Sequence, residues 1–254
     1  MSFDVAAEAY DQFMGRFSQP LAAPFLALAG LAPGDRAVDV GCGPGALTEP
    51  LVSLLGADRV SAVDPSAPFV AAVETRLPGV DVRRGSAEDL PFDDDSFDAA
   101  LASLVVHFMT DPVAGLREMA RVTRPGGRVL ASVWDHAGGA GPLSTFWQGV
   151  RDLEPGAHDE SGLSGTLEGQ LVDLGERAGL TDVEPHTVTV RVGFETFEEW
   201  WQPYERGVGP AGAFVGRLDR GSRERLVDHL RGLLPDPPFE LSATAWCIRG
   251  RAPR

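Results

Sequence analysis

An aspartate followed by three glycines at alternate positions is the feature of this sequence that most directly suggests chemistry. The run Val38-Asp39-Val40-Gly41-Cys42-Gly43-Pro44-Gly45 predicts a short buried strand, a tight turn and a helix that begins near Ala46. Glycine lets the backbone turn sharply and leaves no Cβ where a ligand approaches. The free N–H groups and positive dipole end of the following helix favour an anionic ligand group. The run therefore predicts a nucleoside-type cofactor at the end of the first strand.

The glycine spacing alone allows more than one interpretation. Gly41, Gly43 and Ala46 also satisfy the dinucleotide fingerprint of NAD enzymes, and a glycine-rich turn need not bind any ligand. Asp39 lies within the strand, two residues before the first glycine. A buried carboxylate there would repel a phosphate but attract an ammonium or sulfonium group. Asp39 therefore favours a cationic cofactor.

A second carboxylate stands where a ribose would be bound. The residues before Asp64 predict a second strand that ends at this aspartate, about 20 residues past the glycine turn, which suits bonds to ribose hydroxyls. NAD enzymes share this feature, so it indicates a ribose and not a particular cofactor. Alternatively, Asp64 is a helix-start residue before Pro65, and both roles are compatible.

Two further blocks follow in order. The first is Gly85-Ser86-Ala87-Glu88-Asp89-Leu90-Pro91-Phe92, after a strand near Val80–Arg84. The second is Leu101 to Met109, followed by Asp111-Pro112, which predicts an N-cap and first-turn proline for a helix through Val122.

Together the four blocks, from about Ala37 to Trp134, resemble the class I S-adenosylmethionine-dependent methyltransferases. The resemblance is to the branch with ubiquinone-biosynthesis and type 11 small-molecule methyltransferases. It implies an α/β fold: a doubly wound, mainly parallel, seven-stranded Rossmann-like sheet with the last strand antiparallel, plus a helical cap insertion. It also implies S-adenosyl-L-methionine as cofactor and S-adenosyl-L-homocysteine as product.

The resemblance assigns a set of residues to the cofactor. They are Tyr10, Arg16, Asp39, Gly41, Cys42, Gly43, Gly45, Asp64, Pro65, Ser86, Ala87, Glu88 and Ser103. The sequence departs from the family at Ser86, where an acid usually accepts from the adenine amino group. Ser86 or Glu88 is the candidate for that contact. Tyr10 and Arg16 are candidates for the methionine carboxylate, or belong to an amphipathic surface helix.

The acceptor pocket is expected beside the ends of the fourth and fifth strands. His107 and His136 follow those strands, on the carboxyl-end side where ligands bind in such sheets. His107 is the candidate catalytic residue, as base or acceptor-orienting group; alternatively it is a structural histidine. Aromatic residues that could line the pocket are Trp147, Trp200, Trp201 and Tyr204. Alternatively, the aromatics pack the insertion onto the sheet.

Composition narrows the function classes. The 254-residue chain has a formal net charge of −15, which argues against nucleic-acid and anionic membrane partners. We expect a cytoplasmic protein, because no apolar segment reaches the roughly 18 residues that span a membrane and no basic, apolar leader is evident. A monomer or homodimer is expected. Two cysteines argue against a disulfide framework. The acidic run Asp93 to Asp95 predicts a solvated turn and no metal site.

The predicted organisation has four parts. Residues 1–35 form an N-terminal helical segment over the cofactor, 36–192 the Rossmann-like core, 193–238 the cap insertion, and 239–254 the final edge strand and tail. The expected activity is methyl transfer to a small molecule by in-line displacement. The alternatives are a non-methylating enzyme that uses the sulfonium electrostatically, as in a cyclisation, and a catalytically silent cofactor-binding module.

Overall fold

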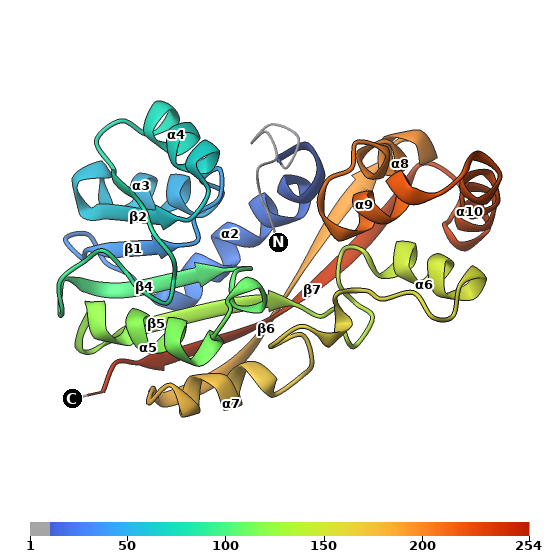
Figure 1. Cartoon of the computed structure of the whole chain (residues 1–254). Coiled ribbons are helices and arrows are strands. Elements are labelled where there is room, and N and C mark those ends of the chain that lie inside the picture. The colour runs from blue at the N-terminus through green and yellow to red at the C-terminus, as the bar shows by residue number, and fades with distance from the viewer. Residues whose placement is uncertain (1–10, 254) are drawn as a thin grey trace.

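The computed structural model describes residues 11–253, and within them seven strands form a single sheet in the order β3-β2-β1-β4-β5-β7-β6 (Figure 1). The strands are β1 (Ala37–Val40), β2 (Val60–Asp64), β3 (Asp81–Arg84), β4 (Phe97–Ser103), β5 (Thr123–Trp134), β6 (Thr181–Phe194) and β7 (Phe239–Arg251). Strands β1 to β5 pair in parallel, and β7 is antiparallel to β5 and β6. The predicted mainly parallel sheet with an antiparallel last strand is confirmed.

The position of the last strand differs from the prediction. An edge strand is predicted over residues 239–254, whereas β7 lies between β5 and β6, and β6 occupies the edge. Ala243 and Ala245 are small and fully buried, which suits a strand with neighbours on both sides. The edge strand β6 instead leaves alternate polar residues exposed, including Thr187, Thr189 and Arg191.

Helices cover both faces of the sheet (Figure 1). They are α2 (Arg16–Ala29), α3 (Thr48–Leu55), α4 (Ala67–Arg76), α5 (Pro112–Val122), α6 (Ser144–Leu153), α7 (Gln170–Arg177), α8 (Phe197–Glu205), α9 (Gly209–Arg217) and α10 (Arg220–Leu233). Shorter turns are η1 (Asp11–Gly15), η2 (Ala57–Arg59), η3 (Val106–Phe108) and η4 (Glu160–Gly162). Between residues 11 and 253, no helix is both long and apolar enough to cross a membrane.

The buried side chains of the central strands alternate between two apolar clusters. Ala37 and Leu101 pack with α2 and α3, while Val38 and Ala102 pack with α5 and α7. All four residues of β1 are buried. Such burial on both faces is typical of a parallel sheet covered by helices.

The cap insertion forms α8, α9 and α10, which gather at one end of the long strands β6 and β7 (Figure 1). Helix α6 packs against α10, and its Phe146 stacks on Tyr204 of α8 with ring centroids 4.5 Å apart. Trp200, Trp201 and Tyr204 are at most 6% exposed. The apolar cluster that contains them is continuous with the α2 face of the sheet.

Helix α5 starts at the predicted position. The Asp111 side chain accepts a hydrogen bond from the Ala114 N–H at 3.0 Å, and Pro112 occupies the first turn. The predicted N-cap is confirmed.

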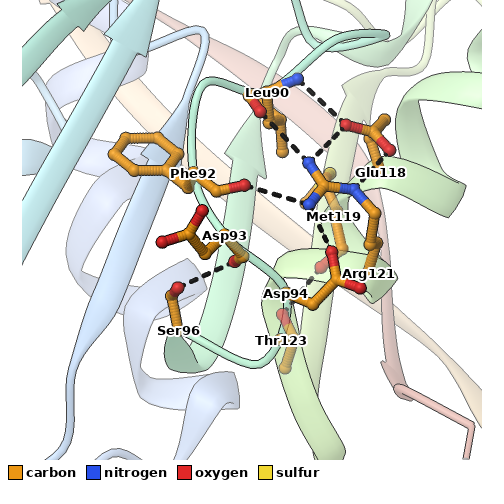
Figure 2. Close-up of polar contacts among 9 residues, drawn as sticks. All are labelled: Leu90, Phe92, Asp93, Asp94, Ser96, Glu118, Met119, Arg121 and Thr123. Carbon is orange, nitrogen blue, oxygen red and sulfur yellow. Dashed lines mark hydrogen bonds and ion pairs between the residues drawn. The ribbon is translucent and has the colours of Figure 1, made fainter.

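An arginine near the end of α5 holds the loop between β3 and β4 (Figure 2). The Arg121 guanidinium donates to the carbonyl oxygens of Leu90 and Phe92 at 3.1 and 2.9 Å, and to Asp94 at 2.6 Å. It also binds Glu118 through two nitrogens, both at 2.7 Å, and Glu118 accepts from the Leu90 N–H. This network lowers the pKa of Glu118, chiefly through its bond to Arg121. The loop that carries the third sequence block is therefore anchored to α5.

We expect Arg121→Met to lower the free energy of unfolding by about 1–3 kcal/mol, because it leaves two loop carbonyls without this donor and Glu118 without its charged partner. Urea denaturation measures this change. The matched control is Arg124→Met, since Arg124 is 57% exposed in its ion pair with Asp98 and exposed pairs contribute about 0–1 kcal/mol. Equal effects of the two substitutions would contradict the anchoring role.

Candidate functional site

The glycine turn lies at the carboxyl end of β1 and folds onto the end of β2. Gly41, Gly43 and Gly45 have φ values of +72°, +52° and +101°, in the left-handed region that favours glycine. The N–H groups of Gly41 and Cys42 donate to the Val63 carbonyl at 2.7 and 3.0 Å. The sequence prediction of a sharp turn at the strand end is confirmed.

The glycines are required for different reasons. A Cβ on Gly41 would lie 2.5 Å from a methyl carbon of Val105, in the segment that follows β4. A Cβ on Gly43 would meet no atom of the described residues within 4 Å. The first glycine therefore allows two segments to touch, whereas the second leaves open space on the outer side of the turn.

Asp64 ties the turn to the start of α4. Its Oδ2 accepts from the Gly43 N–H at 2.9 Å and its Oδ1 from the Ser66 N–H at 2.8 Å. Burial raises the pKa of the carboxyl, against the lowering by these two bonds. Asp64 is thus the last residue of β2, beside the glycine turn, and it bonds the N-cap residue of α4 without being that cap itself.

Asp39 is the more deeply buried carboxylate, with 1% of its surface exposed. Its Oδ2 accepts from the Thr48 hydroxyl at 2.7 Å. Burial, and to a smaller extent the charge of Asp64, raise the pKa of Asp39 to about 7, while the Thr48 bond lowers it. Two neighbouring carboxylates that resist ionisation would both be stabilised by a bound cation. Thr48 carries no motif by which sequence analysis would have found it.

Cys42 is buried within the turn and has a free thiol. Burial raises the pKa of this thiol well above its usual value, and the nearby Asp39 and Asp64 raise it further. A thiolate is therefore disfavoured, which agrees with a small buried residue and not with a nucleophile.

The loop after β3 holds Ser86, Ala87 and Glu88. Glu88 is committed to the backbone before α5, since its Oε1 accepts from the Thr110 N–H at 2.7 Å. Ala87 is buried, while Ser86 is exposed. Of the two candidates for an adenine contact, Ser86 is the exposed one and Glu88 already has a structural partner.

The residue after β4 has a strained backbone. Leu104 is buried and has a φ of +63°; such a conformation in a non-glycine residue costs on the order of 1–3 kcal/mol. Its N–H donates to the carbonyl and the hydroxyl oxygen of Ser132 at 2.9 and 3.1 Å, which holds the conformation in place. The Ser132 hydroxyl also reaches the Ser103 hydroxyl at 3.5 Å. Neither Leu104 nor Ser132 carries a local sequence signal for this arrangement.

His107 and His136 come together at the ends of β4 and β5, with ring centroids 5.8 Å apart. His107 is 6% exposed, and its Nδ1 has no hydrogen-bond partner among the described residues. Burial lowers the pKa of His107 to about 3, helped by His136. Burial also lowers the pKa of His136 to about 4, against the opposite effect of Asp159 and Asp135. Both imidazoles are therefore neutral at neutral pH.

The other predicted residues have varied surroundings. Tyr10 lies outside the described residues. Arg16 forms an ion pair with Glu199 of α8 and lies over the Phe194 ring, with its guanidinium carbon 4.9 Å from the centroid. The Pro65 carbonyl accepts from Arg84 at 3.0 Å. Arg16 thus links α2 to the cap insertion.

Of the four aromatic residues predicted for the acceptor pocket, Trp147 shares a small pocket with His136. The other three pack against one another: Trp200 and Trp201 lie 5.0 and 5.7 Å from Tyr204, between ring centroids. Trp201 and Tyr204 also stack on Phe146 of α6. That these three residues line an acceptor pocket stays a prediction.

The arrangement is suited to binding a cationic, nucleoside-type molecule. It offers an open glycine turn, two buried carboxylates and two neutral imidazoles at the carboxyl ends of neighbouring strands. Among residues 11–253, no cluster of histidine, cysteine, aspartate or glutamate has the makings of a metal site.

Comparisons with known proteins agree with this arrangement. Residues 38–131 match the family described as "Methyltransferase domain". Demethylmenaquinone methyltransferase of Renibacterium salmoninarum is 37% identical over 118 residues, which cover 46% of this chain and 48% of that protein. The chain thus spans about half the length of the curated relatives it matches.

Solved structures share the fold at low sequence identity. Phosphoethanolamine N-methyltransferase 2 of Haemonchus contortus, with S-adenosylhomocysteine, has a TM-score of 0.59 and 19% identity, covering 98% of this chain and 57% of that one. The [4+2]-cyclase SpnF has a TM-score of 0.57 and 21% identity, and the match covers 92% of this chain and 80% of that one.

The buried Asp39 predicts a pH dependence of stability. Its folded pKa of about 7 lies above the unfolded value of about 3.9, so the folded state holds a proton that the unfolded state releases. Stability from this group is therefore present below about pH 4 and is lost as pH rises to about 7. The free energy of unfolding of Asp39→Asn, minus that of the parent, should therefore increase by about 2–4 kcal/mol between about pH 4 and pH 7. Above this range the difference should change little.

Urea denaturation at a series of pH values measures this difference. Asp58→Asn is the matched control, because the Asp58 side chain is 84% exposed. A difference between Asp39→Asn and the parent that does not change with pH would contradict the raised pKa.

Proposed function

We infer that this chain, a class I S-adenosylmethionine-dependent methyltransferase by its domain and its fold, transfers the methyl group of its cofactor to a small-molecule acceptor. The observation that carries this proposal is the glycine turn with Asp39 and Asp64. It combines an open backbone face with buried carboxylates, which together suit a cationic nucleoside.

The residues at the turn fit S-adenosyl-L-methionine. The missing Cβ of Gly43 leaves space where a ligand can approach the backbone. Asp64 stands at the tip of β2, where a carboxylate can accept from ribose hydroxyls. Asp39 and Asp64 favour the positive charges of the cofactor over the phosphates of NAD, because a phosphate beside two buried carboxylates would be repelled.

When bound, the cofactor supplies a methyl group on a positively charged sulfur. The chain's own residues then have to align an acceptor and exclude water. The strained turn at Leu104 and the buried His107 lie after β4, the strand next to β1. This position supports a role for His107 toward the acceptor. The neutral His107, with its unpartnered Nδ1, can orient an acceptor by a hydrogen bond. A pKa of about 3 makes it a weak base.

Several observations support a small-molecule acceptor. The net charge of −15 disfavours nucleic acid. Proteins similar to this chain are named for small molecules, demethylmenaquinone and phosphoethanolamine among them. The likeness to the cyclase SpnF favours a second candidate, a cyclisation that leaves the cofactor's methyl group in place. Formation of S-adenosyl-L-homocysteine during turnover distinguishes the two.

The decisive test is calorimetric titration with S-adenosyl-L-methionine, S-adenosyl-L-homocysteine and NADH. We expect the first two to bind and NADH not to bind. Asp64→Ala should weaken binding by about 1–3 kcal/mol through lost charge-assisted bonds, whereas the exposed Asp58→Ala should not. Tight NADH binding without a response to the other two ligands would overturn the proposal.

His107→Ala should lower turnover by about tenfold or more while the affinity for S-adenosyl-L-homocysteine changes little, since His107 is proposed to contact the acceptor. Turnover is measured as S-adenosyl-L-homocysteine formed with an acceptor found by screening. The exposed His158→Ala is the control. Equal loss of turnover and cofactor affinity would place His107 in the cofactor site instead.

A further inference from the structure

The small pocket shared by His136 and Trp147 has further lining residues that the proposed methyl transfer does not use. It is formed by the turn after β5, by α6 and by the segment around η4, which contribute His136, Trp147 and Glu160. Its inner volume of about 10 Å³ admits a single water-sized group. The Arg151–Asp159 ion pair also lines this pocket. None of the sequence motifs includes Glu160.

Two buried polar groups in this pocket lack a partner. Glu160 is 5% exposed and Trp147 is 4% exposed. The Glu160 Oε2 and the Trp147 indole Nε1 have no hydrogen-bond partner among the described residues. The indole N–H is close enough to lower the pKa of the carboxyl, but the two side chains do not reach the geometry of a hydrogen bond. A buried polar group without a partner is unfavourable, so two of them in one pocket indicate an occupant.

One of the two groups needs a hydrogen-bond acceptor and the other needs a donor, and this limits which chemical group can occupy the pocket. An indole N–H can only donate, whereas a carboxylate oxygen accepts. A hydroxyl group satisfies both at once. An ammonium would leave the indole unpaired, and an anion would be repelled by Glu160 and Asp159. Because Arg151 is already paired with Asp159, no free cation of the pocket lining attracts an anion.

The Glu160 carboxyl can form a hydrogen bond with a hydroxyl group in either protonation state. Burial, with a smaller effect of Asp159, raises the pKa of Glu160 to about 7, against the effects of Trp147 and its own backbone. Glu160 in turn raises the pKa of Tyr204 on α8, beyond the main effect of burial. The charged form accepts from a hydroxyl, and the neutral form can also donate to one.

The pocket lies in line with the proposed methyl-transfer site. Strands β1, β4 and β5 are consecutive neighbours, so the ends of β1 and β5 are about 10 Å apart along the sheet edge. His107 follows β4, and His136, which lines the pocket, follows β5. A small molecule whose reacting atom lies near His107 would therefore extend its far end toward Glu160.

We propose that Glu160 and Trp147 form a subsite for a hydroxyl group at the end of the acceptor remote from the methylated atom. This rests on the proposed function and narrows the acceptor to hydroxylated small molecules. Glu160 and Trp147 bind this group and take no part in the displacement itself.

Phenol and fluorobenzene test the subsite, because they share a ring and differ in the hydroxyl. Protein with ¹⁵N-labelled tryptophan and S-adenosyl-L-homocysteine is titrated with each, and the indole N–H signals are followed by NMR. The chain has five tryptophans, and Trp147→Phe identifies the Trp147 signal. We expect phenol, at the millimolar concentrations suited to a fragment, to shift that signal saturably. Fluorobenzene should bind at least about tenfold more weakly.

Variants separate the subsite from general effects on folding. Glu160→Met removes the acceptor oxygens at similar volume and should weaken phenol binding at least about tenfold, whereas the exposed Glu154→Gln should leave it unchanged. Equal binding of phenol and fluorobenzene, or no saturable shift with phenol, would overturn the proposal and leave a pocket that holds only water. Phenol binding without any response to S-adenosyl-L-homocysteine would support the subsite and contradict the proposed function.

Discussion

The close approach of Gly41 to Val105 is the constraint on which the rest of the site depends. A Cβ at position 41 would lie 2.5 Å from the valine side chain, so the turn after β1 and the segment after β4 touch only because this residue has none. Since parallel strands end on the same side of a sheet, this contact brings the glycine turn beside the segment after β4, which also carries His107. The position of the site's side chains therefore depends on this close approach of two backbone segments.

Burial then sets the chemistry of this edge. Asp39 and Asp64 are buried at the ends of adjacent strands, and burial raises the pKa of both. The same burial lowers the pKa of His107. Carboxyls that resist ionisation and an imidazole that resists protonation share one physical cause, the loss of water. A bound cation would offset the free-energy cost of ionising the buried carboxylates. The carboxyl ends of these strands therefore favour a positively charged ligand.

The N-terminal helix and the cap insertion close over the same side of the molecule. Arg16 pairs with Glu199, and Phe13 packs edge-on against Tyr204 with ring centroids 4.9 Å apart. The aromatic residues of α8 belong to the same apolar cluster as the N-terminal helix. Their shared burial couples the insertion to the sheet, which is what a site that must exclude water requires.

The sequence by itself determined the glycine turn, the two carboxylates and the start of α5 at Asp111. These depend on local backbone rules: glycine for left-handed conformations, a short polar residue before a helix, and apolar strands between turns. Only the tertiary structure decided that β7 lies inside the sheet, that Arg16 pairs with Glu199, and that Glu160 and Trp147 meet in one pocket. Those outcomes arise from contacts between segments far apart along the chain or on separate elements, and no local pattern records which side chains burial will leave without a partner.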